Sequence, residues 1–273
     1  MNKDSLNRMI WSPLEYADAA VLANEVAEEM LSRLDWMTIK PKIIVDMGCG
    51  TGGLSIRLPE RYPNAQVLAL DFSEPMVQYA REQFILAGEV PVSCVCADAG
   101  RLPLEDLSVD LIVANLLLPW HGDVKSLLRE WRRVLRPEGL LLFSALGPDT
   151  LKEFHNLLNI NEIPFMVDMH DLGDLLLGEG FADPVLDVNQ YTVLYRDPVR
   201  LLRELHASGM LLSKPGIDVN QGMIHDAEGQ LPVTYEVVFA HAFMPEQTDA
   251  VSVSSDGIAR VPLDHLRRQL KQR

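Results

Sequence analysis

The chain has 273 residues, 48% of them hydrophobic and 23% charged, which excludes a disordered protein and is typical of one large domain or one domain with an inserted lobe. Its 24 basic and 39 acidic side chains give a formal charge of -15, which disfavours unspecific attraction to nucleic acid or to an anionic membrane. Cys49, Cys94 and Cys96 lie in or beside predicted strands without zinc-site spacing, so we expect reduced core thiols, no metal site and a cytoplasmic protein.

The first residues predict a helix and no targeting signal. No apolar stretch with a cleavage site begins the chain, and no run approaches the ~18 apolar residues of a membrane span. Residues 13–34, "PLEYADAAVLANEVAEEMLSRL", carry apolar side chains at helical spacing, and Pro13 suits a first helical turn. We predict one amphipathic helix before the sheet, within an N-terminal helical lid at residues 1–40.

A glycine-rich turn follows the first predicted strand. In "KIIVDMGCGTGGLS" the β-branched run at residues 43–45 indicates a strand covered on both faces, with Asp46 at its carboxyl end. Gly48, Gly50 and Gly52 then allow a sharp turn against which a ligand lies directly, next to a helix N-terminus. The glycines also satisfy the G-x-G-x-x-G spacing of dinucleotide binders. The turn alone therefore predicts a nucleotide-sized ligand without identifying it.

Three further predicted strands also end in a polar residue. "QVLALDFS" ends in Asp71, at about the 20-residue spacing from the glycines at which an acidic side chain meets a ribose diol. "VSCVCADAGRLPL" ends in Asp98, and "VDLIVANLLLPW" ends in Asn115. Because the carboxyl ends of the strands of a doubly wound sheet border one crevice, we expect these side chains to surround a common ligand.

The loop "NLLLPWHGD", which leaves the fourth strand, has two possible uses. Trp120 and His121 are candidates for shaping a substrate pocket, whereas His121 and Asp123 together resemble the H-x-D half of an iron facial triad. Asp123 also suits the N-cap of the helix "VKSLLREWRRVLR". The arginines of this helix form either a solvated face or a basic patch for an acidic partner.

The remaining chain predicts the second half of the sheet. Residues 140–147 suit a fifth strand, and "PFMVDMHDLGDLLLGEGFADPVLDV" a helix, a turn and a strand. We divide the chain into a ligand-binding core at 41–150, remaining core elements and a covering lobe at 151–230, a last antiparallel strand at 231–245, and a tail at 246–273. The tail suggests a polar linker and a short basic helix.

Taken together, these motifs resemble a known family. "VDMGCGTGG", "LALDFSEPMV", "CADAGRLPL" and "LRPEGLLLFS" are similar, in this order, to class I S-adenosylmethionine-dependent methyltransferases. A nicotinamide dehydrogenase would match only the glycines. The resemblance implies a seven-stranded, doubly wound α/β fold and S-adenosyl-L-methionine as the cofactor.

The resemblance also implies roles for individual residues. Asp46 would lie near the methionine ammonium group, Asp71 on the ribose and Asp98 on the adenine. Tyr16 would be a lid contact, although a tyrosine packed beneath a helix is an equal alternative, and Met76 has core packing as its alternative. The implied cofactor-binding residues are Asp46, Gly48, Gly50, Gly52, Asp71, Phe72, Met76, Asp98, Ala99 and Asn115, and those of the substrate pocket are Tyr16, Trp120 and His121.

Longer stretches point to a subfamily. "LREWRRVLRPEG", "FSALGPDTLKEF" and "VTYEVVFAHAF" resemble the biotin-synthesis methyltransferases that esterify the free carboxyl of malonyl on acyl carrier protein. They also resemble a mitochondrial assembly factor for respiratory complex I that hydroxylates an arginine. Three functions therefore remain open: malonyl O-methylation, protein modification or chaperoning, and methylation of another small molecule.

The chemistry of malonyl esterification is consistent with the sequence. A malonyl carboxylate has a pKa near ~4, so it is ionised at neutral pH and requires no general base. An arginine or lysine of the covering lobe should hold it, and Arg196, Arg200, Arg203 and Lys214 are available. The charge of -15 opposes an acidic carrier protein, so we expect a local basic face to receive that partner.

Overall fold

The computed structural model describes residues 12–154, 166–211, 226 and 228–246, and the main chain of two short strands, β8 (Ser252–Val253) and β9 (Ala259–Arg260). Its main sheet has seven strands in the order β3-β2-β1-β4-β5-β7-β6, which confirms the predicted doubly wound α/β fold. The strands are β1 (Ile43–Met47), β2 (Gln66–Asp71), β3 (Val92–Cys96), β4 (Val109–Ala114), β5 (Leu135–Leu146), β6 (Ala182–Tyr195) and β7 (Leu231–Phe243).

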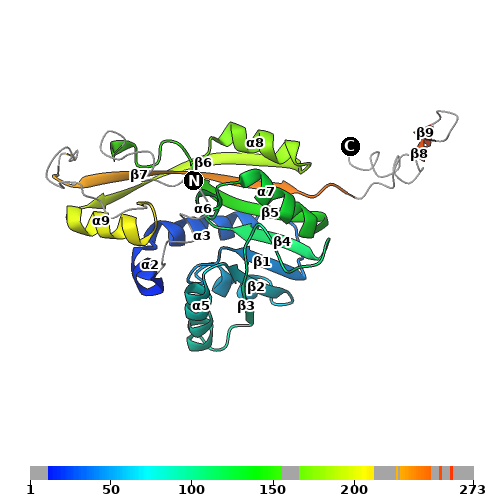
Figure 1. The fold of residues 1–273 in the computed structure, drawn as a ribbon, viewed down its shortest axis with the longest axis horizontal. Helices are drawn as coiled ribbons and strands as arrows, with labels where there is room; N and C mark the ends of the chain where they lie inside the picture. Colours follow the sequence, from blue (N-terminus) through cyan, green and yellow to red (C-terminus); the bar gives the residue numbers. More distant parts are fainter. Residues whose placement is uncertain are drawn as a thin grey trace.

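Helices cover both faces of this sheet (Figure 1). Alternate residues of each strand enter opposite cores: Ile44 packs in the core under α3 and α9, and Val45 packs in the core under α7 and α8. The described helices are α2 (Pro13–Ala19), α3 (Val21–Leu34), the 3-10 turn η1 (Ser55–Arg57), α4 (Leu58–Arg61), α5 (Glu74–Leu86), α6 (Leu118–His121), α7 (Val124–Val134), η2 (Lys152–Phe154), α8 (Met169–Gly178) and α9 (Pro198–Ala207).

The antiparallel part of the sheet differs in detail from the prediction. Strands β1 to β5 are mutually parallel, and β7 is antiparallel to β5, as we predicted for residues 231–245. However, β7 is not at the edge, because it lies between β5 and the earlier strand β6. The burial pattern gives the reason: β7 is buried along nearly its whole length, whereas β6 alternates between partly buried and exposed residues and suits an edge.

The N-terminal segment forms two helices where we predicted one. The chain leaves helical geometry at Ala20 (φ -78°, ψ 26°), so α2 and α3 are separate. Helix α3 packs on the sheet through residues such as Met30 and Leu34, which are buried. Arg33 fastens its C-terminal end, because its guanidinium makes two hydrogen bonds, of 2.5 and 2.8 Å, to Asp187 on β6.

Several other predictions have mixed outcomes. Helix α7 ends at Val134, two residues before the predicted end, because Pro137 disfavours helical geometry in the residue before it and β5 already begins at Leu135. The stretch "PDTLKEFHNLLNI", residues 148–160, also predicts a helix, and its second half, residues 155–160, lies outside the described residues. The first residues, Lys214 and the basic tail helix lie outside them as well. The division into domains remains a prediction.

None of the described helices is long and apolar enough to cross a lipid bilayer.

Candidate active site

The turn after β1 has a shape that requires glycine. Gly48, Gly50 and Gly52 have φ values of +69°, +53° and +88°, a region that residues with a Cβ atom rarely adopt. Space is also limiting at two of them: a Cβ on Gly48 would lie 2.7 Å from the side chain of Leu117, and one on Gly52 would lie 2.7 Å from the ring of Phe84. The turn is thus packed on one side and leaves its main chain open to a cavity on the other.

Asp71 joins this turn to the end of β2. Its side chain is 7% exposed, one carboxylate oxygen accepts a 3.0 Å hydrogen bond from the Gly50 N-H, and the other accepts a 2.8 Å bond from the Ser73 N-H. Burial raises the pKa of Asp71, and these main-chain donors act in the opposite direction. The carboxylate keeps further lone pairs for a ligand in the cavity that it lines.

Asp46 is a buried carboxyl at the end of β1. It is 1% exposed and accepts a hydrogen bond from the Ser55 hydroxyl. Burial raises its pKa to about 7, and the charge of Asp71 adds to this increase. A buried carboxyl with a raised pKa is stabilised in its ionised form by a nearby cation, so the site favours a cationic ligand.

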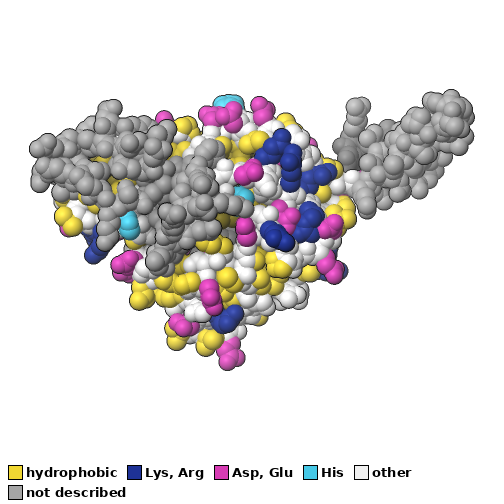
Figure 2. All heavy atoms as spheres, in the orientation of Figure 1, with side chains coloured by type: hydrophobic (Ala, Val, Ile, Leu, Met, Phe, Trp, Pro, Cys, Tyr) yellow, Lys and Arg dark blue, Asp and Glu magenta, His cyan; other side chains and the backbone are white. Residues whose placement is uncertain are grey.

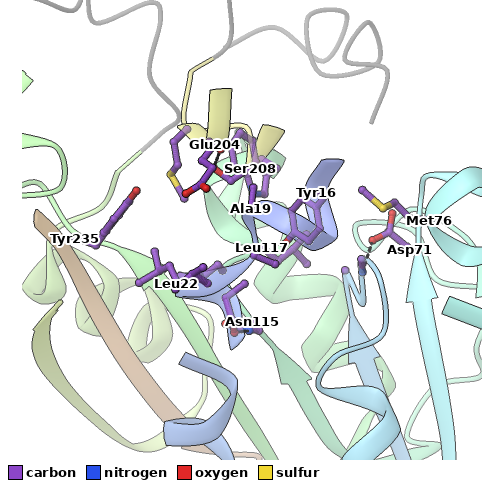
Figure 3. Close-up of a pocket in the computed structure, with 18 of the residues that line it drawn as sticks. Tyr16, Ala19, Leu22, Asp71, Met76, Asn115, Leu117, Glu204, Ser208 and Tyr235 are labelled. Carbon is purple, nitrogen blue, oxygen red and sulfur yellow. Dashed lines mark hydrogen bonds between the residues drawn. The ribbon is translucent and has the colours of Figure 1, made fainter. Parts of the chain in front are cut away.

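Three adjoining cavities meet at the glycine turn, and Gly48 lines all of them. Asp71 lines the main cavity and the second, Asp98 lines the second, and Asp46 lines the third. The carboxylates therefore surround connected space without sharing one cavity. Predicted site residues on the main cavity are Tyr16, Gly48, Gly50, Asp71, Phe72, Met76, Asn115 and Trp120, several of which are labelled in Figure 3.

The second cavity contains the residue whose position differs most from expectation. His121, predicted for the substrate pocket, lines this cavity with Asp98, Ala99 and Trp120 and is not on the wall of the main cavity. Its Nδ1 lies 3.1 Å from the Asp123 carbonyl oxygen, which requires Nδ1 to donate, and in the neutral imidazole Nε2 is then an acceptor. Nε2 is buried, has no hydrogen-bond partner among the described residues, and lies 3.6 Å from Asp98 Oδ1.

Asp123 itself has a structural position. Its carboxylate accepts a 3.0 Å hydrogen bond from the Ser126 N-H and caps α7, as predicted. No group of three candidate metal-binding side chains occurs among residues that the structure describes.

Asn115 links the sheet to the N-terminal helices. Its Nδ2 donates a 2.7 Å hydrogen bond to the carbonyl of Ala23 in α3, and its Oδ1 accepts a 2.9 Å bond from the buried Ser144 hydroxyl of β5. The amide lines the main cavity while both of its ends are engaged by protein. Asn115 therefore positions the start of α3, and with it α2, over the ends of the strands.

Tyr16 lies over the glycine turn. Its ring is 3.5 Å from the place where a Cβ of Gly50 would be, and it lines both the main and the third cavity. Burial raises the pKa of the phenol to about 12, with smaller contributions from the charges of Asp71 and Asp46. The hydroxyl is thus neutral at physiological pH and remains a hydrogen-bond donor.

The far end of the main cavity consists of residues that sequence reasoning missed. Tyr235 of β7, Tyr195 of β6 and Glu204 of α9 line this end together, and Arg200 Nε donates a 2.7 Å hydrogen bond to the Glu204 carboxylate. Burial raises the pKa of both phenols, and the charge of Glu204 adds to this increase. Ser208 and Met210 complete this end. One indication was available in the sequence: Glu204 stands between Leu201 and Leu205 on the apolar face of a helix, where a charged residue is unusual.

These observations fit a bound nucleoside with a cationic group. The glycine turn offers open main chain, Asp46 favours a cation, and His121 Nε2 is an unused buried acceptor beside Asp98. Together with the strand order, the arrangement defines a class I methyltransferase, a class that uses S-adenosylmethionine. In agreement, a family model for a methyltransferase domain matches residues 45–143.

Relatives specify the family further. Malonyl-[acyl-carrier protein] O-methyltransferase of Methylovorus sp. (strain MP688) is 38% identical over 266 residues, covering 90% of this chain and 89% of that protein. The protein of the same name from Gallionella capsiferriformans (strain ES-2) is 38% identical over 266 residues, covering 89% and 90%. Haemonchus contortus phosphoethanolamine N-methyltransferase 2, solved with S-adenosyl-L-methionine, shares the fold at a TM-score of 0.57 and 17% identity, covering 89% of this chain and 60% of that one. The chain belongs to the malonyl-[acyl-carrier protein] O-methyltransferase family.

Proposed function

We propose that this enzyme transfers a methyl group from S-adenosyl-L-methionine to the free carboxyl of a malonyl thioester on acyl carrier protein, in biotin synthesis. One observation carries the proposal. A single cavity extends from the glycine turn and Asp71 to a separate polar end formed by Tyr195, Glu204 and Tyr235 (Figure 3). Such a cavity suits a donor at one end and an extended polar acceptor at the other, and the names of the relatives identify the acceptor.

The donor end follows from the charges and acceptors around the glycine turn. We assign the ammonium group of the donor to Asp46, its ribose hydroxyls to Asp71, and its adenine amine to Asp98 together with His121 Nε2. The open turn at Gly48 and Gly50 lies against the donor, Phe72 and Met76 border it, and Ala99 closes the second cavity. When bound, the donor supplies a methyl group on a positively charged sulfur.

The acceptor requires positioning and no proton transfer. A carboxylate is ionised at neutral pH, so the chain needs no general base. The work of the protein is to align the acceptor and exclude water, for which effective molarities of about 10⁵ M or more are possible. Tyr16, Leu117 and Trp120 stand on the cavity wall between its two ends and would confine the acceptor there.

The described part of the acceptor end is lined mainly by hydroxyl groups and Glu204. The predicted cation stays a prediction, because Lys214 lies outside the described residues. No lysine or arginine lines the described wall of the main cavity, and Arg200 is held by Glu204 on the wall of that end. The Arg200–Glu204 pair has no net charge, so it does not repel an anionic acceptor as a lone carboxylate would. Tyr195, Tyr235 and Ser208 supply hydrogen-bonding groups there.

We also place the enzyme in the cytoplasm. Support comes from Cys49, Cys94 and Cys96, which are all free thiols, as is usual in a reducing compartment.

The test is direct methyl transfer. Purified enzyme is incubated with methyl-labelled S-adenosylmethionine and malonyl-acyl carrier protein, and base-labile methyl ester on the carrier is measured. We expect label on the malonyl carrier and none on acetyl carrier, which lacks a free carboxyl. A protein that binds the donor with micromolar affinity and produces no base-labile ester would contradict the proposal.

A further inference from the structure

Helix α9 presents two different faces. Its inner face contributes Glu204 and, just after the helix ends, Ser208 to the main cavity. Its outer face carries Val199, Arg200 and Arg203, and Arg196 precedes the helix cap by one residue. Positions 199, 200 and 203 follow the spacing of residues on one side of a helix, and Arg196 lies just before the extended cap residue Asp197. All four are exposed, Val199 to 64%.

The charge on this outer face is locally positive on an acidic protein. The acid that neutralises Arg200 is Glu204, whose side chain is 9% exposed and points to the cavity side. Asp197, the other acid of this segment, accepts the Val199 N-H as the helix cap. Arg196 and Arg203 form no ion pair with any residue in the described part of the chain. Within residues 196–204, three guanidinium groups are therefore exposed together with one exposed carboxylate, that of Asp197.

The helix predicted as the basic patch, α7, differs in this respect. Arg129 and Lys125 share Glu179, Arg133 binds Glu130 and Asp106, and Arg136 binds Asp110. Figure 2 shows basic and acidic side chains interleaved over α7. Most of its basic side chains are thus paired within the protein, and Arg132 is the one basic residue of α7 without an ion pair in the described part of the chain.

The position of α9 next to the acceptor end makes its charge relevant to substrate. The helix packs against α2, which carries Tyr16 on the cavity wall, and α2 exposes Leu14 to 70% (Figure 1). A partner on the outer face is one helix diameter, about 10 Å, from the cavity. At physiological salt the Debye length is about 8 Å, so local charge here governs the approach of a partner more than the net charge of -15 does.

We propose that the outer face of α9, formed by Arg196, Val199, Arg200 and Arg203, is the docking surface for the acidic carrier protein that delivers the malonyl group. This inference rests on the proposed function. The arginines would pair with carboxylates of the carrier, and Val199 would supply a small apolar contact between them. Such charge complementarity increases the association rate, and this increase becomes smaller as the ionic strength rises.

The test compares a carrier-bound and a carrier-free substrate. We reverse charge with the double variant Arg196→Glu/Arg203→Glu and retain Arg200, because its partner Glu204 lines the cavity. The matched control is Lys125→Glu/Arg132→Glu on α7, where both residues are exposed. The rate of methyl transfer is measured with malonyl-acyl carrier protein and with malonyl-coenzyme A, between about 25 and 250 mM NaCl.

We expect the α9 variant to lose at least about tenfold in kcat/KM on the carrier, mainly through KM, and to show a flatter salt dependence. Its activity on malonyl-coenzyme A should stay within about twofold, which also shows that it is folded, and the α7 variant should resemble the wild type. An equal loss on both substrates, no loss at all, or a loss confined to the α7 variant would overturn the docking surface while leaving the proposed function intact. If wild-type enzyme methylates neither substrate, the proposed function itself fails.

Discussion

The Gly50 N-H donates a 3.0 Å hydrogen bond to the carboxylate of Asp71, and this bond joins the turn after β1 to the end of β2. The same carboxylate also holds the Ser73 N-H at the start of α5. The residue proposed to bind the ribose thus also maintains the shape of the glycine turn. We therefore expect donor affinity and turn geometry to be coupled through this side chain.

Replacing Asp71 with asparagine tests this coupling. The amide has one acceptor oxygen, so its NH₂ group must face one of the two main-chain donors. We expect the donor affinity to decrease about 10- to 100-fold, or ~1 to 3 kcal/mol, through a lost charge-assisted bond and a disturbed turn. Titration calorimetry with S-adenosylhomocysteine measures this change, and an unaltered dissociation constant would remove Asp71 from the donor site.

Asp46 should make the stability of the ligand-free enzyme depend on pH. Its pKa is raised to about 7 in the folded protein and is about 4 in an unfolded chain. The folded state therefore binds the proton more tightly, so this contribution to stability is complete below pH 4 and is lost as the pH rises towards 7. The variant Asp46→Asn cannot titrate. Its free energy of unfolding relative to wild type should increase by on the order of 2 kcal/mol between pH 5 and pH 8.

Denaturant unfolding of both proteins at the two pH values provides this measurement. The comparison is made without donor, and an Asp46→Asn variant with the same pH profile as the wild type would contradict the buried, protonated carboxyl. When the donor is bound, the wild type should have the larger free energy of unfolding at pH 8, because the ionised carboxylate is the form that pairs with an ammonium group.

Gly52 allows backbone strain and steric overlap to be separated. Both Gly52 and Gly88 have positive φ. In Gly52→Ala the new Cβ would lie 2.7 Å from the Phe84 ring, whereas in Gly88→Ala it would have no atom within 4 Å. We expect Gly88→Ala to cost ~1 kcal/mol from strain and Gly52→Ala at least ~1 to 3 kcal/mol more from overpacking. Melting temperatures measure the difference. Adding Phe84→Leu should recover part of the loss at position 52 and none at position 88.

His121 should contribute to adenine recognition through Nε2. Removing this acceptor in His121→Leu should weaken S-adenosylhomocysteine by about 3- to 10-fold, corresponding to one hydrogen bond of ~1 kcal/mol. An analogue with hypoxanthine in place of adenine lacks the exocyclic amine, so wild type and variant should bind it about equally. An equal weakening of both ligands would show that His121 acts on packing and not on the amine.

Tyr235 provides a test of the acceptor end. It lines this end with Tyr195 and Glu204, so Tyr235→Phe removes one hydroxyl from the wall and leaves the Arg200–Glu204 pair in place. We expect KM for the malonyl substrate to increase about 5- to 20-fold while the dissociation constant of the donor is unchanged. A loss of donor affinity of similar size would place Tyr235 in the donor site instead.

The sequence by itself determined the donor side of this protein. The β-branched run of β1, the glycines after it and Asp71 at the end of β2 are local patterns, and parallel strands with polar carboxyl ends have few ways to be arranged. The seven-stranded fold was implied by the resemblance of these motifs, in their order, to class I methyltransferases. Positive φ at Gly48, Gly50 and Gly52 follows from a turn that no other residue type tolerates well.

The acceptor side was decided by tertiary structure. Tyr195, Glu204 and Tyr235 meet because β7 is inserted between β5 and β6, an antiparallel arrangement selected by burial summed over the whole of both strands. His121 follows the same rule: it precedes a turn through Gly122, at φ +72°, and its Nε2 lies 3.6 Å from Asp98 Oδ1 on the second cavity. Contacts between distant segments depend on register and packing, which no short stretch of sequence encodes. Tertiary contacts also pair most basic side chains of α7 with acids, whereas Arg196 and Arg203 beside and on α9 have no ion pair in the described part of the chain.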